Sequence, residues 1–231
     1  MIVSDRFIYI HLHKSGGSFV NEALMRFVPG ATMFGYHLPR SRVPPAMRHL
    51  PVLGFVRNPW SYYVSWYAFQ ARMDQPNALF QFASKNRSLD FSGTVRNLLD
   101  LGSDSENLDT LLKLLPSAYT NRGLNLPAFA LEPIRGSGKG FYSWLYDYMY
   151  AGGASPSRVG RTENLRGDLF ELLASVQQPI SHEMREFIDS AAPRNTSTHV
   201  DWRRFYDADL AALVAERDAS IIAEHGYRFA A

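Results

Sequence analysis

Two segments of the chain follow the same order of apolar strand, tight turn and helix. In the first, residues 6–12 (Arg-Phe-Ile-Tyr-Ile-His-Leu) are rich in β-branched and aromatic side chains and lead to the pair Gly16-Gly17. Such a stretch predicts a buried strand that enters a tight turn. Ser18 then stands where it can cap a helix, which we expect to end before Pro29-Gly30.

The second segment starts at Pro51. Residues 52–56 predict another apolar strand, Arg57-Asn58-Pro59 a turn, and the residues from Ser61 onward a helix. Two such units in succession favour parallel strands with helices packed on the sheet. We therefore predict an α/β fold with a central, mainly parallel β-sheet flanked by helices.

The rest of the chain is expected to complete a single domain over residues 1–231, a length that suits one α/β domain. Residues 1–73 hold the two strand–turn–helix units. Residues 74–157 are typical of an insertion, with short apolar helices between Gly/Pro-rich stretches. Residues 158–231 predict a returning strand at 158–161, a helix after it, and a last helix near 207–224.

Composition excludes several classes of protein. The 24 basic and 22 acidic residues leave a formal charge of +2, which is too small to predict a nucleic-acid binder. The absence of cysteine excludes disulfides and Cys-ligated metal sites, and it fits a cytoplasmic protein. The sequence contains no run of about 18 apolar residues, so it predicts no membrane span. Its N-terminal residues do not resemble a signal peptide. The histidines lack the spacing of metal ligands, so we expect no metal site.

The first glycine turn is a candidate anion site. Residues 13–18 read His-Lys-Ser-Gly-Gly-Ser at the junction of strand and helix, where backbone N–H groups and the helix dipole converge. Lys14 adds a charge, and Ser15 and Ser18 add hydroxyl donors. A nucleoside triphosphate loop places its lysine after the glycines, whereas Lys14 precedes them. A plain Gly-Gly turn beside a solvated lysine is the simpler alternative.

The second turn offers another anion site. Arg57 follows its strand at the carboxyl edge of the predicted sheet, where open α/β sheets bind ligands. Ser61 and Ser65 lie one helical turn apart, so Arg57 and Ser65 can converge on one dianion. A loop arginine in a salt bridge is the alternative. Two anion sites on neighbouring strand ends suit a nucleotide with phosphates on both its 5′ and 3′ oxygens.

These residues resemble the motifs of sulfotransferases that use 3′-phosphoadenosine 5′-phosphosulfate (PAPS), in particular the carbohydrate-type branch. Residues 7–18 are similar to the 5′-phosphosulfate loop, H-x-P-K-[ST]-G-G-[ST], and residues 54–67 to the 3′-phosphate motif, V-R-[DN]-P-x-x-R-x-x-S-x-Y. Residues 159–169 (V-G-R-T-E-N-L-R-G-D-L) are similar to the branch's V-G-R-x-E-N-L segment. Residues 195–199, 205–206 and 226–229 are weaker matches. His13 and Tyr62 stand where the family usually has proline and arginine.

The resemblance implies a P-loop-like sulfotransferase fold and transfer of a sulfuryl group from PAPS to an acceptor hydroxyl, on a carbohydrate or small molecule. No metal is expected, because a sulfonate carries less charge than a phosphate. The implied cofactor-binding residues are Lys14, Ser15, Gly16, Gly17 and Ser18 on the 5′ side and Arg57 and Ser65 at the 3′-phosphate. Lys14 is also the implied catalytic group at the leaving oxygen.

A base is needed near the acceptor, and His37 is the candidate. It lies between the two cofactor motifs, where this family often places a catalytic histidine, and an imidazole ordinarily titrates near pH 6.5. A surface histidine is the simpler alternative, and Glu22 is the rival base. We expect His11 in the core.

Two other functions stay open at this point. A P-loop kinase is disfavoured, because Lys14 precedes the glycines and Arg57, not an aspartate, follows the second strand. A catalytically silent nucleotide-binding protein of the same fold is the other alternative. The presence of Lys14 and of a candidate base argues against it, because such a protein needs neither.

Overall fold

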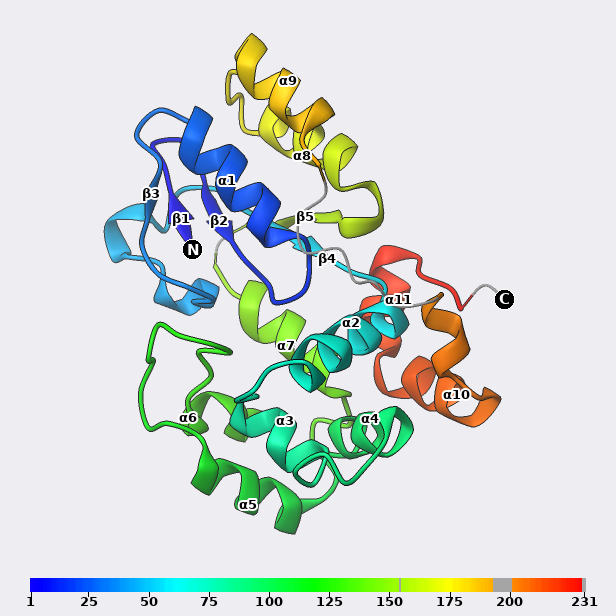
Figure 1. Cartoon of the computed structure of the whole chain (residues 1–231). Helices are drawn as coiled ribbons and strands as arrows, with labels where there is room; N and C mark the ends of the chain where they lie inside the picture. Colours follow the sequence, from blue (N-terminus) through cyan, green and yellow to red (C-terminus); the bar gives the residue numbers. More distant parts are fainter. Residues whose placement is uncertain (154, 193–200, 230–231) are drawn as a thin grey trace. The chain divides into compact units, whose positions relative to one another are not determined.

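A computed structural model describes residues 1–153, 155–192 and 201–229 (Figure 1). The weak sequence match at residues 195–199 lies outside them. The chain forms two compact units, one of Met1–Arg57 with Tyr146–Thr196 and one of Asn58–Leu145 with Ser197–Ala231. The first unit holds the sheet and the second is helical. A single domain over the whole chain stays a prediction.

The described part of the first unit contains a five-stranded sheet in the order β3-β1-β2-β4-β5. The strands are β1 (Ile2–Val3), β2 (Ile8–Ile10), β3 (Thr32–Met33), β4 (Val52–Val56) and β5 (Arg158–Arg161). The neighbours β2, β4 and β5 are parallel, whereas β1 is antiparallel to both β2 and β3. The sheet is therefore mixed: the predicted parallel strands β2, β4 and β5 run from its centre to one edge, and the short strands β1 and β3 complete the other side.

Helices pack against the sheet of the first unit. They are α1 (Gly17–Phe27), α8 (Leu165–Ser175), α9 (His182–Ser190) and the end of α7 (Phe141–Tyr150), with 3₁₀ turns at Arg40–Arg42, Pro45–Met47 and Thr162–Asn164. Apolar side chains of α1, α8 and α9 form one core with Tyr9 and Phe55 of the sheet. Gly54 of β4 instead meets the ring of Tyr150, which a Cβ at this position would approach to within 2.3 Å. Glycine is required there by close packing.

The Tyr150 hydroxyl joins β2 to β4 at the point where the two strands end. It accepts a hydrogen bond from the Phe55 N–H (3.1 Å) and lies 3.2 Å from the Ile10 carbonyl and 3.0 Å from the Phe55 carbonyl. Since a hydroxyl has one proton, it donates to one of these carbonyls at a time. The contacts satisfy buried backbone groups that the strands leave as they separate.

The second unit is built from helices. They are α2 (Pro59–Ala71), α3 (Ala78–Ala83), α4 (Phe91–Leu99), α5 (Ser105–Leu114), α6 (Ala128–Leu131), the start of α7, α10 (Ala208–Arg217) and α11 (Ala219–His225), with 3₁₀ turns at Glu132–Ile134 and Trp202–Phe205. Asn58 caps α2 by accepting from the Ser61 N–H. The aromatic residues Trp60, Tyr62, Tyr63 and Trp66 are buried in this unit, as core side chains.

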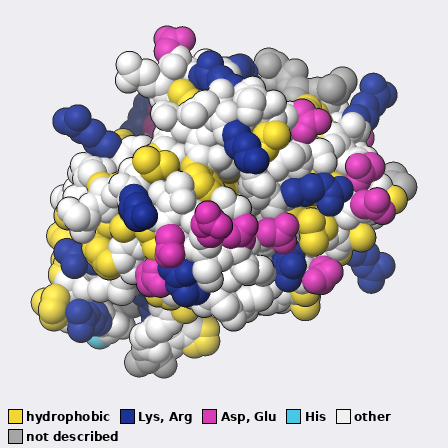
Figure 2. Space-filling model, turned by 90° about the horizontal axis from the view of Figure 1, so that it is seen from below, with side chains coloured by type: hydrophobic (Ala, Val, Ile, Leu, Met, Phe, Trp, Pro, Cys, Tyr) yellow, Lys and Arg dark blue, Asp and Glu magenta, His cyan; other side chains and the backbone are white. Residues whose placement is uncertain are grey.

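The surface carries charges of both signs. Figure 2 shows Lys and Arg side chains interspersed with Asp and Glu on the face that it draws, in keeping with the small net charge of +2. Among the described residues, no helix has the length and apolar character needed to cross a membrane.

The predicted helix over 207–224 is in fact two helices, α10 and α11, separated at Asp218. The Asp218 side chain is buried, where its carboxylate accepts hydrogen bonds from the Tyr63 hydroxyl and the Ser143 N–H, both at 2.8 Å. Burial raises the pKa of Asp218 to about 6, although the hydrogen bonds from Ser143 and Tyr63 oppose the rise. This carboxylate serves as a distant cap for the Ser143 N–H in the first turn of α7.

Asp218→Asn should change the pH dependence of stability. Because the folded pKa of about 6 lies above the ordinary 3.8, proton binding by Asp218 stabilises the fold below pH 4, and that stabilisation is lost as the pH rises through 6. At about 1.4 kcal/mol per pKa unit, the loss is roughly 3 kcal/mol. Urea unfolding at pH 4 and pH 7 should show wild type losing this much relative to Asp218→Asn.

The control is Asp209→Asn, because Asp209 is an exposed residue of α10. The difference between Asp209→Asn and wild type should change far less between pH 4 and pH 7 than the difference for Asp218→Asn, because the Asp209 side chain is exposed to water. A pH-independent difference for Asp218→Asn would contradict the raised pKa.

Candidate functional site

The first glycine turn has an unusual backbone. Lys14 (φ 60°) and Gly16 (φ 76°) are both left-handed, with Ser15 between them. Helix α1 begins at Gly17 with Gly16 as its N-cap residue and no side-chain cap. The prediction that Ser18 caps this helix is therefore wrong: the left-handed Gly16 turns the chain first, and Ser18 lies in the opening turn of the helix.

Three successive N–H groups of this turn point to an anion site. Within residues 1–153, 155–192 and 201–229, no acceptor takes a hydrogen bond from the N–H of Ser15, Gly16 or Gly17. Left-handed residues alternating with right-handed ones form a concave nest of N–H groups, which binds anions. The positive end of α1 adds to the same potential. The turn thus has donors in place for a phosphate or sulfate oxygen.

The Ser15 hydroxyl does not have the role that the sequence predicted, that of a donor to the anion. The Ser15 hydroxyl is buried and donates to the Leu12 carbonyl at 2.6 Å, so its proton holds the turn together. Ser15 can therefore serve a ligand through its N–H. Gly17 lies against the His11 ring, which a Cβ at residue 17 would approach to 1.9 Å. Only glycine fits at Gly17.

Arg57 connects the two predicted anion sites. It follows β4 directly, and its Nη1 donates to the Lys14 carbonyl at 3.4 Å. A guanidinium has five N–H donors, so this one contact does not exhaust its capacity to bind a ligand. Lys14 and Arg57 therefore stand at the same carboxyl edge of the parallel strands.

Thr162 brings the third sequence motif to this edge. Its hydroxyl donates to the Val56 carbonyl at 2.9 Å, one residue before Arg57. Leu165, three residues further on, packs against Gly16, where a Cβ would lie 2.9 Å from the Leu165 side chain. Sequence reasoning missed Thr162, although its place directly after the predicted strand 158–161 was a usable signal.

Ser65, the other predicted 3′-phosphate residue, belongs to α2 in the second unit, where it is buried. Arg57 belongs to the first unit. The predicted convergence of these two side chains on one phosphate stays a prediction.

His37 lies among other histidines in the first unit. Its Nδ1 is 2.9 Å from the His11 carbonyl, and its ring stacks on that of His13 with 3.6 Å between centroids. Since a carbonyl can only accept, Nδ1 carries the proton, and the lone pair of the neutral ring is on Nε2. His37 is also left-handed (φ 48°), a strained conformation for a residue with a side chain.

Burial lowers the pKa of His37 to about 4, although the hydrogen bond to His11 opposes the shift. The sequence-based expectation of an ionisation near neutral pH is thus wrong for the free protein. Burial also lowers the pKa of His11 well below its ordinary value. As expected, His11 is buried in the core, where Asn21 Nδ2 lies 3.3 Å from its Nδ1. Both rings are neutral at pH 7.

The alternative base, Glu22, lies on α1 and is half-buried. The position of Glu22 does not decide whether Glu22 or His37 is the base. In the part of the chain that the structure describes, no group of three or more His, Cys, Asp or Glu side chains is arranged to hold a metal ion.

Comparison with known proteins does not assign the chain to a family. No protein-family model matches it, and no curated protein matches it.

The strain at Lys14 gives a stability prediction. A left-handed conformation is unfavourable by roughly 1–2 kcal/mol for a residue with a Cβ, but not for glycine. Lys14→Gly should therefore be more stable to urea than Lys14→Ala, by about 1 kcal/mol after the larger chain entropy of unfolded glycine is counted. Both variants lose the same charge, so the difference reports backbone strain.

The matched control is Lys113, an exposed residue of α5. There glycine should be less stable than alanine by about 1 kcal/mol, because the site is helical. The same sign at both positions would contradict the strain at Lys14.

Proposed function

We propose that the protein is a cytoplasmic sulfotransferase with a P-loop-like fold, which transfers a sulfuryl group from PAPS to a hydroxyl of a carbohydrate or small molecule. The observation that carries the proposal is the meeting of the N–H nest of residues 15–17 with Arg57 at one edge of the parallel strands. The motifs that resemble those of the family are the second line of support.

The donor would be held at two places. The N–H groups of Ser15, Gly16 and Gly17 bind its 5′-phosphate, and Arg57 with Ser65 binds its 3′-phosphate. The Lys14 ammonium stabilises the charge that develops on the bridging phosphate oxygen as its bond to sulfur breaks. The hydrogen bond from Arg57 to the Lys14 carbonyl fixes the backbone from which this ammonium projects.

The acceptor step needs a proton sink. The acceptor oxygen forms a bond to sulfur while the bond from sulfur to the phosphate oxygen breaks, and the hydroxyl proton passes to Nε2 of His37. His37 suits this role because its Nδ1–H is held by the His11 carbonyl and its ring is neutral at pH 7. Since a base with a pKa of about 4 binds a proton weakly, transfer accompanies bond formation, when the hydroxyl becomes acidic.

Exposed aromatic rings beside His37 support an acceptor with an apolar face. Phe34 and Tyr36 retain 50% and 47% of their surface exposed. The Tyr36 ring centroid is 6.1 Å from that of His37. The apolar face of a sugar or of a small aromatic molecule can pack on a ring at this position.

The first test compares nucleotides. The protein should bind 3′-phosphoadenosine 5′-phosphate about ten- to a hundredfold more tightly than AMP, because charge-assisted hydrogen bonds of about 1.5–3 kcal/mol reward the extra 3′-phosphate. Arg57→Ala should remove most of that difference in calorimetric titrations.

Arg6→Ala is the matched control, because Arg6 is an exposed arginine of the same unit. It should leave the affinity ratio unchanged. Equal affinities of wild type for the two nucleotides would overturn the proposal, and tighter binding of ATP with magnesium would favour a kinase.

The second test concerns the base. His37→Ala should lower turnover by a factor on the order of 10²–10⁴ and leave nucleotide affinity unchanged, because the base acts on the acceptor proton. The acidic limb of kcat/KM for wild type should have its midpoint near pH 4, since this parameter reports the free protein, in which the pKa of His37 is about 4.

A carboxylate base would give a similar limb, because carboxylates ordinarily titrate near pH 4. The pair His37→Ala and Glu22→Gln therefore decides the assignment. Near-wild-type turnover of His37→Ala, together with loss of turnover in Glu22→Gln, would transfer the role to Glu22.

A further inference from the structure

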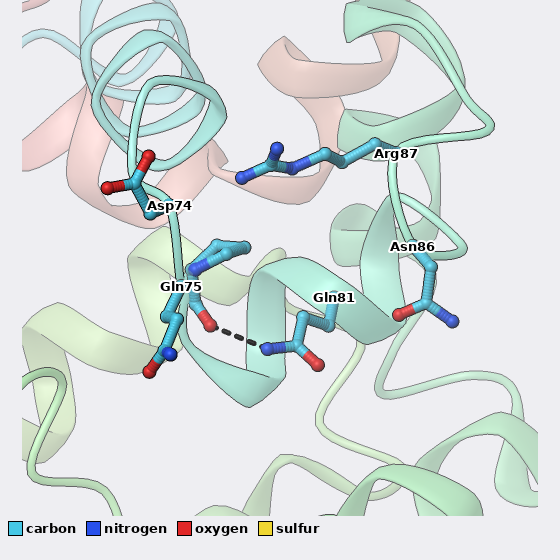
Figure 3. Close-up of a pocket in the computed structure, with 6 residues that line it drawn as sticks. Asp74, Gln75, Gln81, Asn86 and Arg87 are labelled. Atoms are coloured by element: carbon cyan, nitrogen blue, oxygen red, sulfur yellow. Dashed lines mark hydrogen bonds between the residues drawn. The ribbon is translucent and has the colours of Figure 1, made fainter.

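The surface of the helical unit carries an open polar cavity of about 470 Å³, and five of the six residues that line it have exposed side chains. Its walls are the connection from α2 to α3, α3 itself and the connection from α3 to α4, and its lining residues are Asp74, Gln75, Pro76, Gln81, Asn86 and Arg87 (Figure 3). The volume lies within the range of small-molecule sites, which are clefts of about 300–1,000 Å³. None of these residues is part of the proposed sulfuryl-transfer site.

The backbone of one wall is strained. Lys85, Asn86 and Arg87 are three successive non-glycine residues in the left-handed region, with φ of 46°, 54° and 69°. Such residues persist only where the surroundings fix them, and they cluster at ligand sites. Hydrogen bonds hold the turn, from the Asn86 N–H to the Gln81 carbonyl (2.7 Å) and from the Arg87 N–H to the Ser84 hydroxyl (2.9 Å). The strained turn places Asn86 and Arg87 at the cavity.

The polar groups of the cavity are distributed around it. In Figure 3 the Arg87 guanidinium extends from one wall toward the side that carries Asp74. No ion pair joins Asp74 and Arg87 among the described residues, so the carboxylate keeps its capacity to accept from a ligand. Arg87 donates one N–H to the Met73 carbonyl, which fixes the guanidinium and leaves further donors.

The amides complete the set. Gln81 Nε2 donates to the Pro76 carbonyl at 2.7 Å, which orients the side chain and leaves its Oε1 as an acceptor (Figure 3). Asn86 and Gln75 each add one donor group and one acceptor group. The single carboxylate and the single guanidinium cancel in charge. A cavity with mixed donors and acceptors and no net charge matches hydroxyl groups, each of which donates and accepts, better than it matches an ion.

We propose that this cavity binds a neutral, polyhydroxylated ligand, a segment of an oligosaccharide, with Asp74, Asn86 and Arg87 as its principal contacts. The binding itself follows from the chemistry of the cavity. Only the further step, that this ligand is the acceptor of the sulfuryl group, rests on the proposed function.

The test is binding of sugars by the full chain. The protein should retain a subset of neutral oligosaccharides on an array that also carries uronate-containing and sulfated ones, and the best neutral glycan is then titrated by calorimetry. Asp74→Asn should weaken its binding about tenfold, because a neutral amide accepts less strongly from a hydroxyl. Arg87→Ala should weaken it by a similar factor.

A matched control and a conservative variant separate the loss of a ligand contact from a change in the shape of the turn. Arg72→Ala removes an exposed arginine close in sequence that does not line the cavity, and it should leave sugar affinity unchanged. Arg87→Ala alters a strained residue, so Asp74→Asn, which keeps the shape of the side chain, is the decisive variant. Circular dichroism checks that each variant is folded.

Retention of no neutral glycan would overturn the inference, as would undiminished binding in folded Asp74→Asn, or a preference for uronate or sulfated glycans that Arg87→Ala abolishes. Nucleotide titration keeps the two proposals apart. A protein that binds 3′-phosphoadenosine 5′-phosphate and no sugar would refute the cavity alone, whereas one that binds sugar and shows no preference for that nucleotide over AMP would refute the sulfotransferase.

Discussion

The buried hydroxyl of Tyr150 is the contact on which the first unit depends. Parallel strands that diverge leave N–H and C=O groups open at their carboxyl ends, and a buried unpaired group destabilises a fold by about 1–3 kcal/mol. One hydroxyl meets this need for both strands, since it lies within hydrogen-bond distance of Ile10 and Phe55. Gly54 leaves room for the ring. Strand β2 then continues toward the N–H nest of residues 15–17, and β4 continues into Arg57. Both therefore lie at the same edge of the sheet.

His11 links the end of β2 to the glycine turn and to the candidate base. Its ring occupies the space beside Gly17, and its carbonyl accepts from His37. A residue that sequence reasoning placed in the core therefore shapes the glycine turn and sets the tautomer of the candidate base. Lys14 and His37, to which the proposal gives catalytic roles, are both left-handed and therefore strained.

Sequence reasoning predicted β4, a continuous apolar run, with the bounds that the structure shows, and it also predicted β5 at 158–161, although arginine stands at both ends of that strand. The two-residue strands β1 and β3 were missed, because two residues are too few to show a period. The break at Asp218 was missed for another reason: its partners Tyr63 and Ser143 are distant in sequence. The glycine turn was predicted as an anion site, but its N–H groups could be counted only in the structure.

The two candidate sites share a physical signature that does not depend on any resemblance. Each combines left-handed residues other than glycine with polar groups that no protein partner fully uses: the N–H nest beside Lys14, and the carboxylate and amides beside Asn86 and Arg87. Stability alone would favour glycine at most of these positions and closed hydrogen bonds throughout. Lys14 and Arg87 each hold a cationic side chain on strained backbone, which is what a ligand-binding role of these two side chains predicts.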